Sequence, residues 1–371
     1  MKYNWNIQEI RNNIVTLNNM LEFEKEEEKR ETILCQIETY KTMLNITVSK
    51  KYNGLESDVE KLTVFETVKS FFEGFEPEKE EDIYELVADS YPIIRDFSCD
   101  NISISTVICD NETLLYNTDI FLSKYLPSEL YQRFLKFKKE NPNYLHIQKD
   151  CGLNDYHGIT FTDYVLLKKY VLALRNNTVY DIVTLPHEIF HTIFNDYNEE
   201  TFFNSLYYTH EIEGSLANFL VTDFYLKEMP DFGRELMIYF LYDYQENIKS
   251  LLYGIYYLAS LTEKFRFREN KFHKLIASYQ LPNITSEEQL KLCLSSNYAE
   301  TINYSLAYLA GLDLYKIYKN DPELAIYLLQ NIRYAKEEQN IIQLLRRNHI
   351  TFMNDGYQNL KDHVKQVKKV L

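Results

Sequence analysis

The scarcity of chain-breaking residues is the strongest constraint on how this chain folds. Its 371 residues include only 9 glycines and 8 prolines. Sandwiches and barrels need many tight turns built from these two residue types, whereas long segments without them favour helices. We therefore predict a mainly α-helical protein. Hydrophobic residues make up 45% of the chain, which is enough to form a folded core.

The charge balance excludes two classes of partner. The chain has 55 acidic and 40 basic side chains, a formal net charge of −15. Such a surface repels phosphate backbones and anionic lipids, so we expect no nucleic-acid and no membrane partner. The longest apolar stretch, residues 251–261, is too short to span a bilayer. The five cysteines contain no CxxC pair and no secretory signal is recognisable, so we expect a cytoplasmic protein with free thiols.

The first 95 residues form a predicted N-terminal helical region. Apolar residues recur at steps of three and four along residues 7–47, and no glycine or proline occurs before Gly54. This heptad-type spacing fits one long helix or an antiparallel helical pair. We expect a structural arm, with binding of a helical partner or self-association through residues 7–47 as the alternative. Residues 55–90 predict one or two further helices.

Residues 96–371 form the second predicted region. β-branched residues and alternating hydrophobicity in segments 102–108, 144–148 and 157–174 predict a small sheet between about residues 100 and 180. From Asp181 the helical periodicity returns and continues to the C-terminus. A clear helix start follows Asn320, with Asp321 as the N-cap and Pro322 at the first helical position.

The motif His187-Glu188-Ile189-Phe190-His191 indicates a metal site. On a helix the two histidines project about 40° apart, so both imidazoles can reach one zinc ion. Glu188 projects about 100° from His187, where it can act as a general base toward a zinc-bound water without binding the metal. Pro186 is expected in the first turn of this helix, where its missing N–H costs little.

A third ligand is expected from the next helical segment. Glu211 and Glu213 project about 200° apart, so only one of them can face the metal. Glu211 shares its side of the helix with small and polar residues, whereas Glu213 shares its side with Leu216 and Leu220. We therefore predict Glu211 as the ligand of a single zinc ion, with Glu213 as the alternative, and an open fourth position for water.

Three blocks of sequence resemble the thimet oligopeptidase and oligoendopeptidase F family of zinc metallopeptidases. The first, residues 170–191, is similar to the family's strand, loop and helix that ends in HExxH. The second, residues 211–218, looks like the segment whose first glutamate binds zinc. The third, residues 302–325, resembles the family's tyrosine-bearing helix. Together the likeness covers roughly residues 155–330.

The resemblance implies a helical metallopeptidase fold with a small β-sheet bordering the active-site groove. It implies hydrolysis of short peptides, zinc bound by His187, His191 and Glu211, and Glu188 as general base. It also implies that Tyr304 donates a hydrogen bond to the oxyanion formed during hydrolysis.

The chain departs from the family in two transition-state donors and in length. Thr301 stands where the family usually has a second tyrosine, and Leu292 and Cys293 stand where it has a histidine. Tyr298 or Tyr308 is a candidate replacement. The chain is also shorter than typical members. Two alternative functions follow: a maturation protease that trims a specific leader or signalling peptide, and a catalytically impaired, zinc-containing module that binds peptides.

Overall fold

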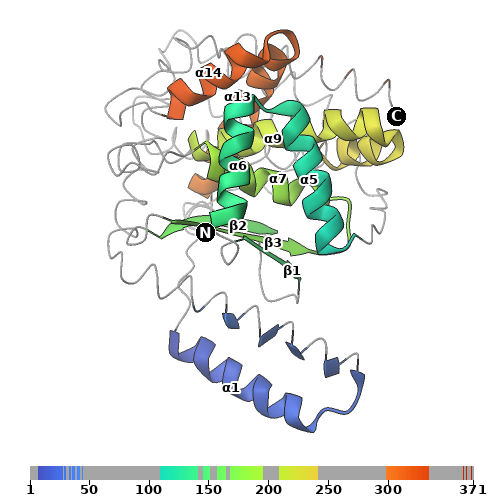
Figure 1. Ribbon diagram of the computed structural model, residues 1–371, viewed down its shortest axis with the longest axis vertical. Coiled ribbons are helices and arrows are strands. Elements are labelled where there is room, and N and C mark those ends of the chain that lie inside the picture. Colours follow the sequence, from blue (N-terminus) through green and yellow to red (C-terminus); the bar gives the residue numbers. More distant parts are fainter. Residues whose placement is uncertain are drawn as a thin grey trace, which may run out of the picture. The chain divides into compact units, whose positions relative to one another are not determined.

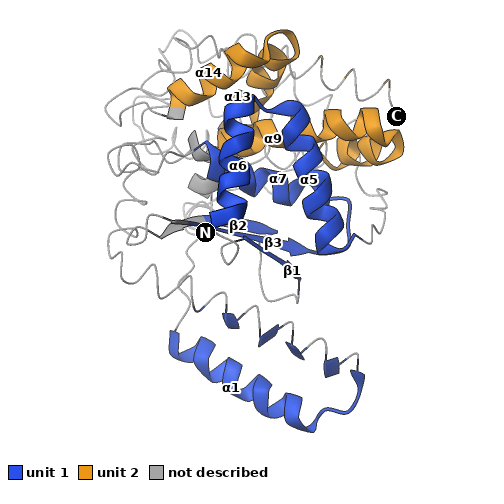
Figure 2. Cartoon of the chain, viewed as in Figure 1, with its two compact units in different colours: residues 1–59, 105–198 blue, residues 60–104, 199–371 orange. Residues whose placement is uncertain are grey.

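The computed structural model describes seven continuous stretches of the chain. These are residues 7–27, 109–140, 145–150, 157–163, 168–194, 209–240 and 298–333, with scattered residues at 29–44 and 362–369. The predicted strand at 102–108 and the predicted helices at 55–90 lie outside the described residues. The chain divides into two compact units, residues 1–59 with 105–198 and residues 60–104 with 199–371, which Figure 2 shows in different colours. The predicted boundary near residue 95 stays a prediction.

The described residues are mostly helical and include one small sheet, as the composition predicted (Figure 1). None of the described helices combines the length and the hydrophobicity that a membrane-spanning segment requires. The N-terminal arm begins with α1 (Ile7–Phe23), and residues 24–26 interrupt the helical pattern. Arg30 donates side-chain hydrogen bonds to the carbonyls of Leu21 (2.8 Å) and Glu24 (2.9 Å) across this break. The arm is therefore not one continuous helix.

A three-stranded sheet lies in the first unit. Its strands are β1 (Leu145–Lys149), β2 (Gly158–Asp163) and β3 (Lys168–Arg175), in the order β1-β3-β2. β1 pairs parallel to β3 and β2 pairs antiparallel to it. The central residues 171–174 of β3 are all buried, and α7 packs on this strand. Two of the three predicted β segments are thus confirmed, and segment 157–174 supplies two strands.

The helix α7 (Asp181–Ile193) packs on this sheet and is held in place by two further helices. α7 contacts β2 and β3, and also α5 (Asn111–Tyr125) and α6 (Ser128–Glu140) (Figure 1). Phe121 of α5 stacks on Phe190 of α7 with ring centroids 6.2 Å apart. Twelve of the thirteen α7 residues are buried. The helix with the HExxH motif is therefore a core element of the first unit.

The second unit is built around the pair α9 (Thr209–Glu228) and α13 (Tyr298–Asn320). Phe219 of α9 packs between Tyr308 and Tyr315 of α13, with ring centroids 5.1 and 5.5 Å away. Gly311 permits a close approach, since a Cβ added there would lie 2.6 Å from the Ser215 Cβ. Residues 230–240 are also helical.

α14 (Pro322–Arg333) follows α13 and begins as the sequence predicted. The Asp321 carboxylate accepts a hydrogen bond from the Leu324 backbone N–H (3.0 Å), and Pro322 occupies the first helical position.

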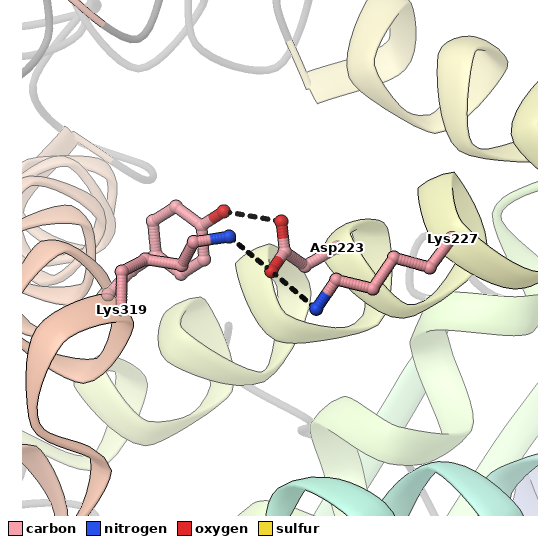
Figure 3. A network of polar contacts seen from close by, with 4 residues as sticks. Asp223, Lys227 and Lys319 are labelled. Carbon is pink, nitrogen blue, oxygen red and sulfur yellow. Dashed lines mark hydrogen bonds and ion pairs between the residues drawn. The ribbon is translucent and has the colours of Figure 1, made fainter.

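A buried carboxylate joins α9 to α13 further along the pair (Figure 3). Asp223 accepts hydrogen bonds from the Tyr315 hydroxyl (2.8 Å) and the Lys319 ammonium (2.6 Å). The Nζ of Lys227, which lies on the same helix, is 3.6 Å from Oδ2 of Asp223. The contacts advance in the same direction along both helices, from Ser215 and Gly311 to Asp223 and Lys319, so α9 and α13 run parallel here.

Replacing Asp223 with Asn is expected to lower the free energy of unfolding by about 1.5 to 3 kcal/mol, because the amide carries no charge and only one of its two terminal atoms can still accept a hydrogen bond. Asp231→Asn is the matched control. Asp231 pairs with Arg234 at 2.9 Å, but its side chain is 93% exposed, so a loss below about 0.5 kcal/mol is expected. Urea unfolding of both variants measures the difference, and equal losses would contradict a structural role of the Asp223 network.

Candidate metal centre

The turn before α7 sets the position of the HExxH helix. β3 ends at Arg175, and the chain turns through Asn177, which has a positive φ of 56°. The Asp181 carboxylate accepts hydrogen bonds from the backbone N–H groups of Asn176 and Asn177, both at 2.8 Å. Burial raises the pKa of the Asp181 carboxyl, although these N–H donors act in the opposite direction. The N-cap itself is Tyr180, which makes no capping bond with its side chain.

The sequence-based position of Pro186 is wrong. It was expected in the first turn of the helix, but α7 begins at Asp181 and Pro186 is its sixth residue. A proline here removes the N–H that would bond to the carbonyl of Ile182. The prediction failed because the first turn is formed by residues of the loop. The N–H groups of Ile182 and Val183 donate to Val179 and Tyr180, which starts the helix before the motif.

His187 and His191 lie on one side of α7, as their spacing predicted. Their ring centroids are 4.8 Å apart and the ring planes meet at 82°. His191 is buried, while His187 is partly exposed. Two imidazoles at this separation can approach one cation from different directions, which suits tetrahedral zinc.

A buried lysine of the central strand holds the end of α7. Lys169 of β3 is 2% exposed and donates a hydrogen bond from its Nζ to the backbone carbonyl of His191. Carbonyls in the last turn of a helix have no partner within the helix, and a cation near them is favourable. Sequence reasoning missed this contact, because Lys169 is one of two lysines at the start of β3 and no pattern distinguishes it from Lys168.

Glu188 faces the sheet. Its side chain is buried, and the Thr160 hydroxyl of β2 donates to its Oε2 at 2.7 Å. The same hydroxyl lies 2.9 Å from the backbone carbonyl of Glu188. Gly158 borders the carboxylate on the same strand, since a Cβ there would lie 2.7 Å from Oε1. Sequence reasoning missed both residues, but a glycine inside a strand often marks a close approach of this kind.

α9 carries both candidates for the third ligand. Glu213 is 0% exposed, as expected for the side of the helix that it shares with Leu216 and Leu220. Glu211 is partly exposed. Among the described residues, His187, His191 and Glu211 are those whose side chains could serve as metal ligands, and Glu211 as the third ligand stays a prediction.

The tyrosines proposed as hydrogen-bond donors belong to α13. Tyr298 and Tyr304 lie in its first two turns. Tyr308 is buried, and its ring packs edge-on against Phe219. Tyr304 stands one turn before Tyr308 and two turns before Gly311. The roles of Tyr304, Tyr298 and Tyr308 in chemistry stay predictions.

Comparison with known proteins identifies the fold. No family model and no curated protein matches the sequence. A solved structure assigned as an oligoendopeptidase F from Bacillus anthracis matches with a TM-score of 0.52, 14% identity, 92% of this chain and 63% of its own. PZ peptidase A matches with a TM-score of 0.55, 13% identity, 96% of this chain and 71% of its own. A protein assigned as a peptidase from Chlamydophila abortus matches with a TM-score of 0.54, 12% identity, 98% of this chain and 63% of its own.

At 12% to 14% sequence identity, these similarities establish the fold of the chain and do not by themselves establish its activity. They agree with the resemblance to oligoendopeptidase F-type proteins at the level of the fold. The chain spans less than two thirds of the length of the Bacillus anthracis and Chlamydophila abortus proteins.

Proposed function

We propose that this chain is a zinc-dependent peptidase that hydrolyses peptide bonds in short peptides. One zinc ion would be held by His187, His191 and Glu211, and Glu188 would be the general base. The observation that carries the proposal is the pair of imidazoles on one side of α7, on the same helix as a buried glutamate whose carboxylate is hydrogen-bonded. Peptidases of the same fold add support.

The chemistry of the donor set fits zinc. Imidazole nitrogen and carboxylate oxygen are both good zinc ligands, and three protein ligands are typical of catalytic zinc sites that keep a fourth position open. The partial exposure of His187 and Glu211 is consistent with access from solvent. A bound zinc ion would supply a water molecule whose pKa is lowered toward about 7 and would polarise the peptide carbonyl.

Three residues of the chain would have further roles in catalysis. Glu188 would take a proton from the water that attacks the peptide carbonyl and would return it to the leaving amine, as general acid–base catalysis requires. Tyr304 would donate a hydrogen bond to the oxygen on which negative charge develops. The second imidazole, His191, would be kept in place by the hydrogen bond from Lys169 to its backbone carbonyl.

The nature of the substrate and the cellular location extend the proposal. Short peptides are proposed as substrates from the fold neighbours and from the resemblance of the motifs to the oligopeptidase family. A cytoplasmic location is proposed from the cysteine pattern, which favours free thiols. In the described part of the chain, Cys109 is a buried free thiol.

Metal removal tests the proposal directly. Protein purified with zinc is expected to contain about one equivalent of the metal and to cleave members of a mixed peptide library. Dialysis against a chelator should abolish cleavage, and one equivalent of zinc should restore it, because the proposed water activation depends on the ion. Metal analysis and mass spectrometry of the library provide the two measurements.

Other outcomes separate the alternatives. One equivalent of bound zinc without cleavage of any peptide would favour the peptide-binding module. Cleavage of a small peptide encoded nearby, with poor activity on the library, would favour a maturation protease. Cleavage that survives complete metal removal would overturn the proposed mechanism.

A further inference from the structure

The Glu188 carboxylate is held by a strand and not only by its own helix. Thr160 precedes Glu188 by 28 residues and belongs to β2, yet its Oγ1 lies 2.7 Å from Oε2 of that carboxylate. The same oxygen lies 2.9 Å from the Glu188 backbone carbonyl. One hydroxyl therefore contacts both the main chain and the reactive end of this side chain, and so fixes the two relative to each other.

The strand also leaves the space that this orientation needs. Residues 158 and 160 face the same side of β2, since side chains alternate along a strand. A Cβ at Gly158 would lie 2.7 Å from Glu188 Oε1 and 2.7 Å from Thr184 Cγ2, closer than real Cβ contacts. Any side chain larger than glycine at 158 would displace the carboxylate. The orientation of the Glu188 side chain thus depends on two positions of β2. Thr160 donates a hydrogen bond to the carboxylate, and Gly158 has no side chain that would collide with it.

We propose that Thr160 is a positioning residue for the Glu188 carboxylate and that Gly158 provides the matching space. The inference rests on the proposed function for its catalytic meaning. A glutamate side chain has several rotatable bonds, and a general base acts only when its oxygen lies within hydrogen-bond reach of the proton that it takes. Thr160 restricts those rotations while the helix fixes the backbone.

Two variants of Thr160 and one of a neighbouring threonine test the inference. Thr160→Val keeps the shape but removes the hydroxyl, and Thr160→Ser keeps the hydroxyl. Thr192 provides a matched control, because its buried hydroxyl donates to the same Glu188 carbonyl at 3.2 Å and the structure gives it no contact with the carboxylate. Thr192→Val therefore removes a similar bond without touching the reactive group.

The zinc-loaded variants are compared by steady-state kinetics on a peptide that the wild type cleaves. Thr160→Val is expected to lower kcat by about 10- to 100-fold, the range typical of residues that orient a catalytic group. KM and zinc content should stay close to wild type, since peptide and metal are bound by other groups. Thr160→Ser should recover most of kcat, and Thr192→Val should change it by less than about threefold. Equal kcat in Thr160→Val and wild type would overturn the inference.

Crystal structures of wild type and Thr160→Val give a second readout that does not need activity. The inference expects the Glu188 side chain to turn or lose order in Thr160→Val while α7 stays in place. An unchanged carboxylate would overturn it. If the wild type cleaves no peptide, the proposed function fails, but this structural comparison still decides whether Thr160 positions Glu188. Should Thr160→Val fail to fold, Thr160→Ala removes the same hydroxyl with a smaller side chain.

Discussion

Replacing Glu188 with Gln is expected to reduce peptide hydrolysis by about 10² to 10⁴-fold, the usual contribution of a general base. The amide cannot take a proton from water. It keeps the size of the carboxylate, and its carbonyl oxygen can still accept the hydrogen bond from Thr160, which lies 2.7 Å from Oε2. Because Glu188 is not a proposed ligand, zinc content should stay at about one equivalent.

The measurement pairs kcat/KM on a cleaved peptide with metal analysis of the same preparation. Loss of activity together with loss of zinc would indicate that Glu188 binds the metal or supports the fold, which would contradict its assignment as a base. Equal cleavage by the variant and the wild type would remove the proposed mechanism. The thermal unfolding of Glu188→Gln provides the control for a folding defect.

Replacing Glu211 with Gln is expected to weaken zinc binding by about 10² to 10³-fold. Zinc binding to structural sites is worth about 10 to 16 kcal/mol over four ligands, so one ligand accounts for roughly 2.5 to 4 kcal/mol. An amide oxygen is a poorer zinc ligand than a carboxylate, and hydrolysis should fall with the zinc content. Competition titration with a zinc chelator of known affinity measures the change.

Glu213→Gln is the matched control, since it makes the same chemical change two residues away on the same helix. Glu213 is fully buried, so its substitution is expected to alter unfolding and not zinc affinity. The opposite pattern, with zinc lost from Glu213→Gln and kept by Glu211→Gln, would show that the wrong glutamate was chosen from the sequence.

Local signals in the sequence were sufficient for several elements. Asp321 and Pro322 determine the start of α14 through their own backbone and side-chain preferences, and the structure confirms both positions. The shared side of His187 and His191 follows from helical periodicity alone. The heptad spacing could not predict the break in the arm at residues 24–26, because one long helix and an antiparallel helical pair both have this spacing.

Contacts between distant segments were beyond the reach of sequence reasoning. Pro186 was expected in the first turn of α7, but that turn is formed by the preceding residues from Asp181. No sequence pattern predicted this earlier start. Thr160 and Lys169 meet α7 only because β2 and β3 pair and pack against it, and neither residue carries a motif. Glu213 is fully buried, as the apolar composition of its side of α9 predicted, whereas the choice of Glu211 as the metal ligand stays a prediction.

The close approach of Gly311 to Ser215 couples two positions that are almost a hundred residues apart in the chain. A Cβ at 311 would lie 2.6 Å from the Ser215 Cβ, but also 3.1 Å from the Leu216 backbone nitrogen. Reducing Ser215 to glycine would therefore relieve only part of the clash, and the two helices would still have to separate. A larger residue at position 215 or 311 would therefore increase the distance between α9 and α13. That change would also move Glu211 of α9 relative to Tyr304 of α13. Positions 215 and 311 are thus expected to be inherited as a pair of small residues.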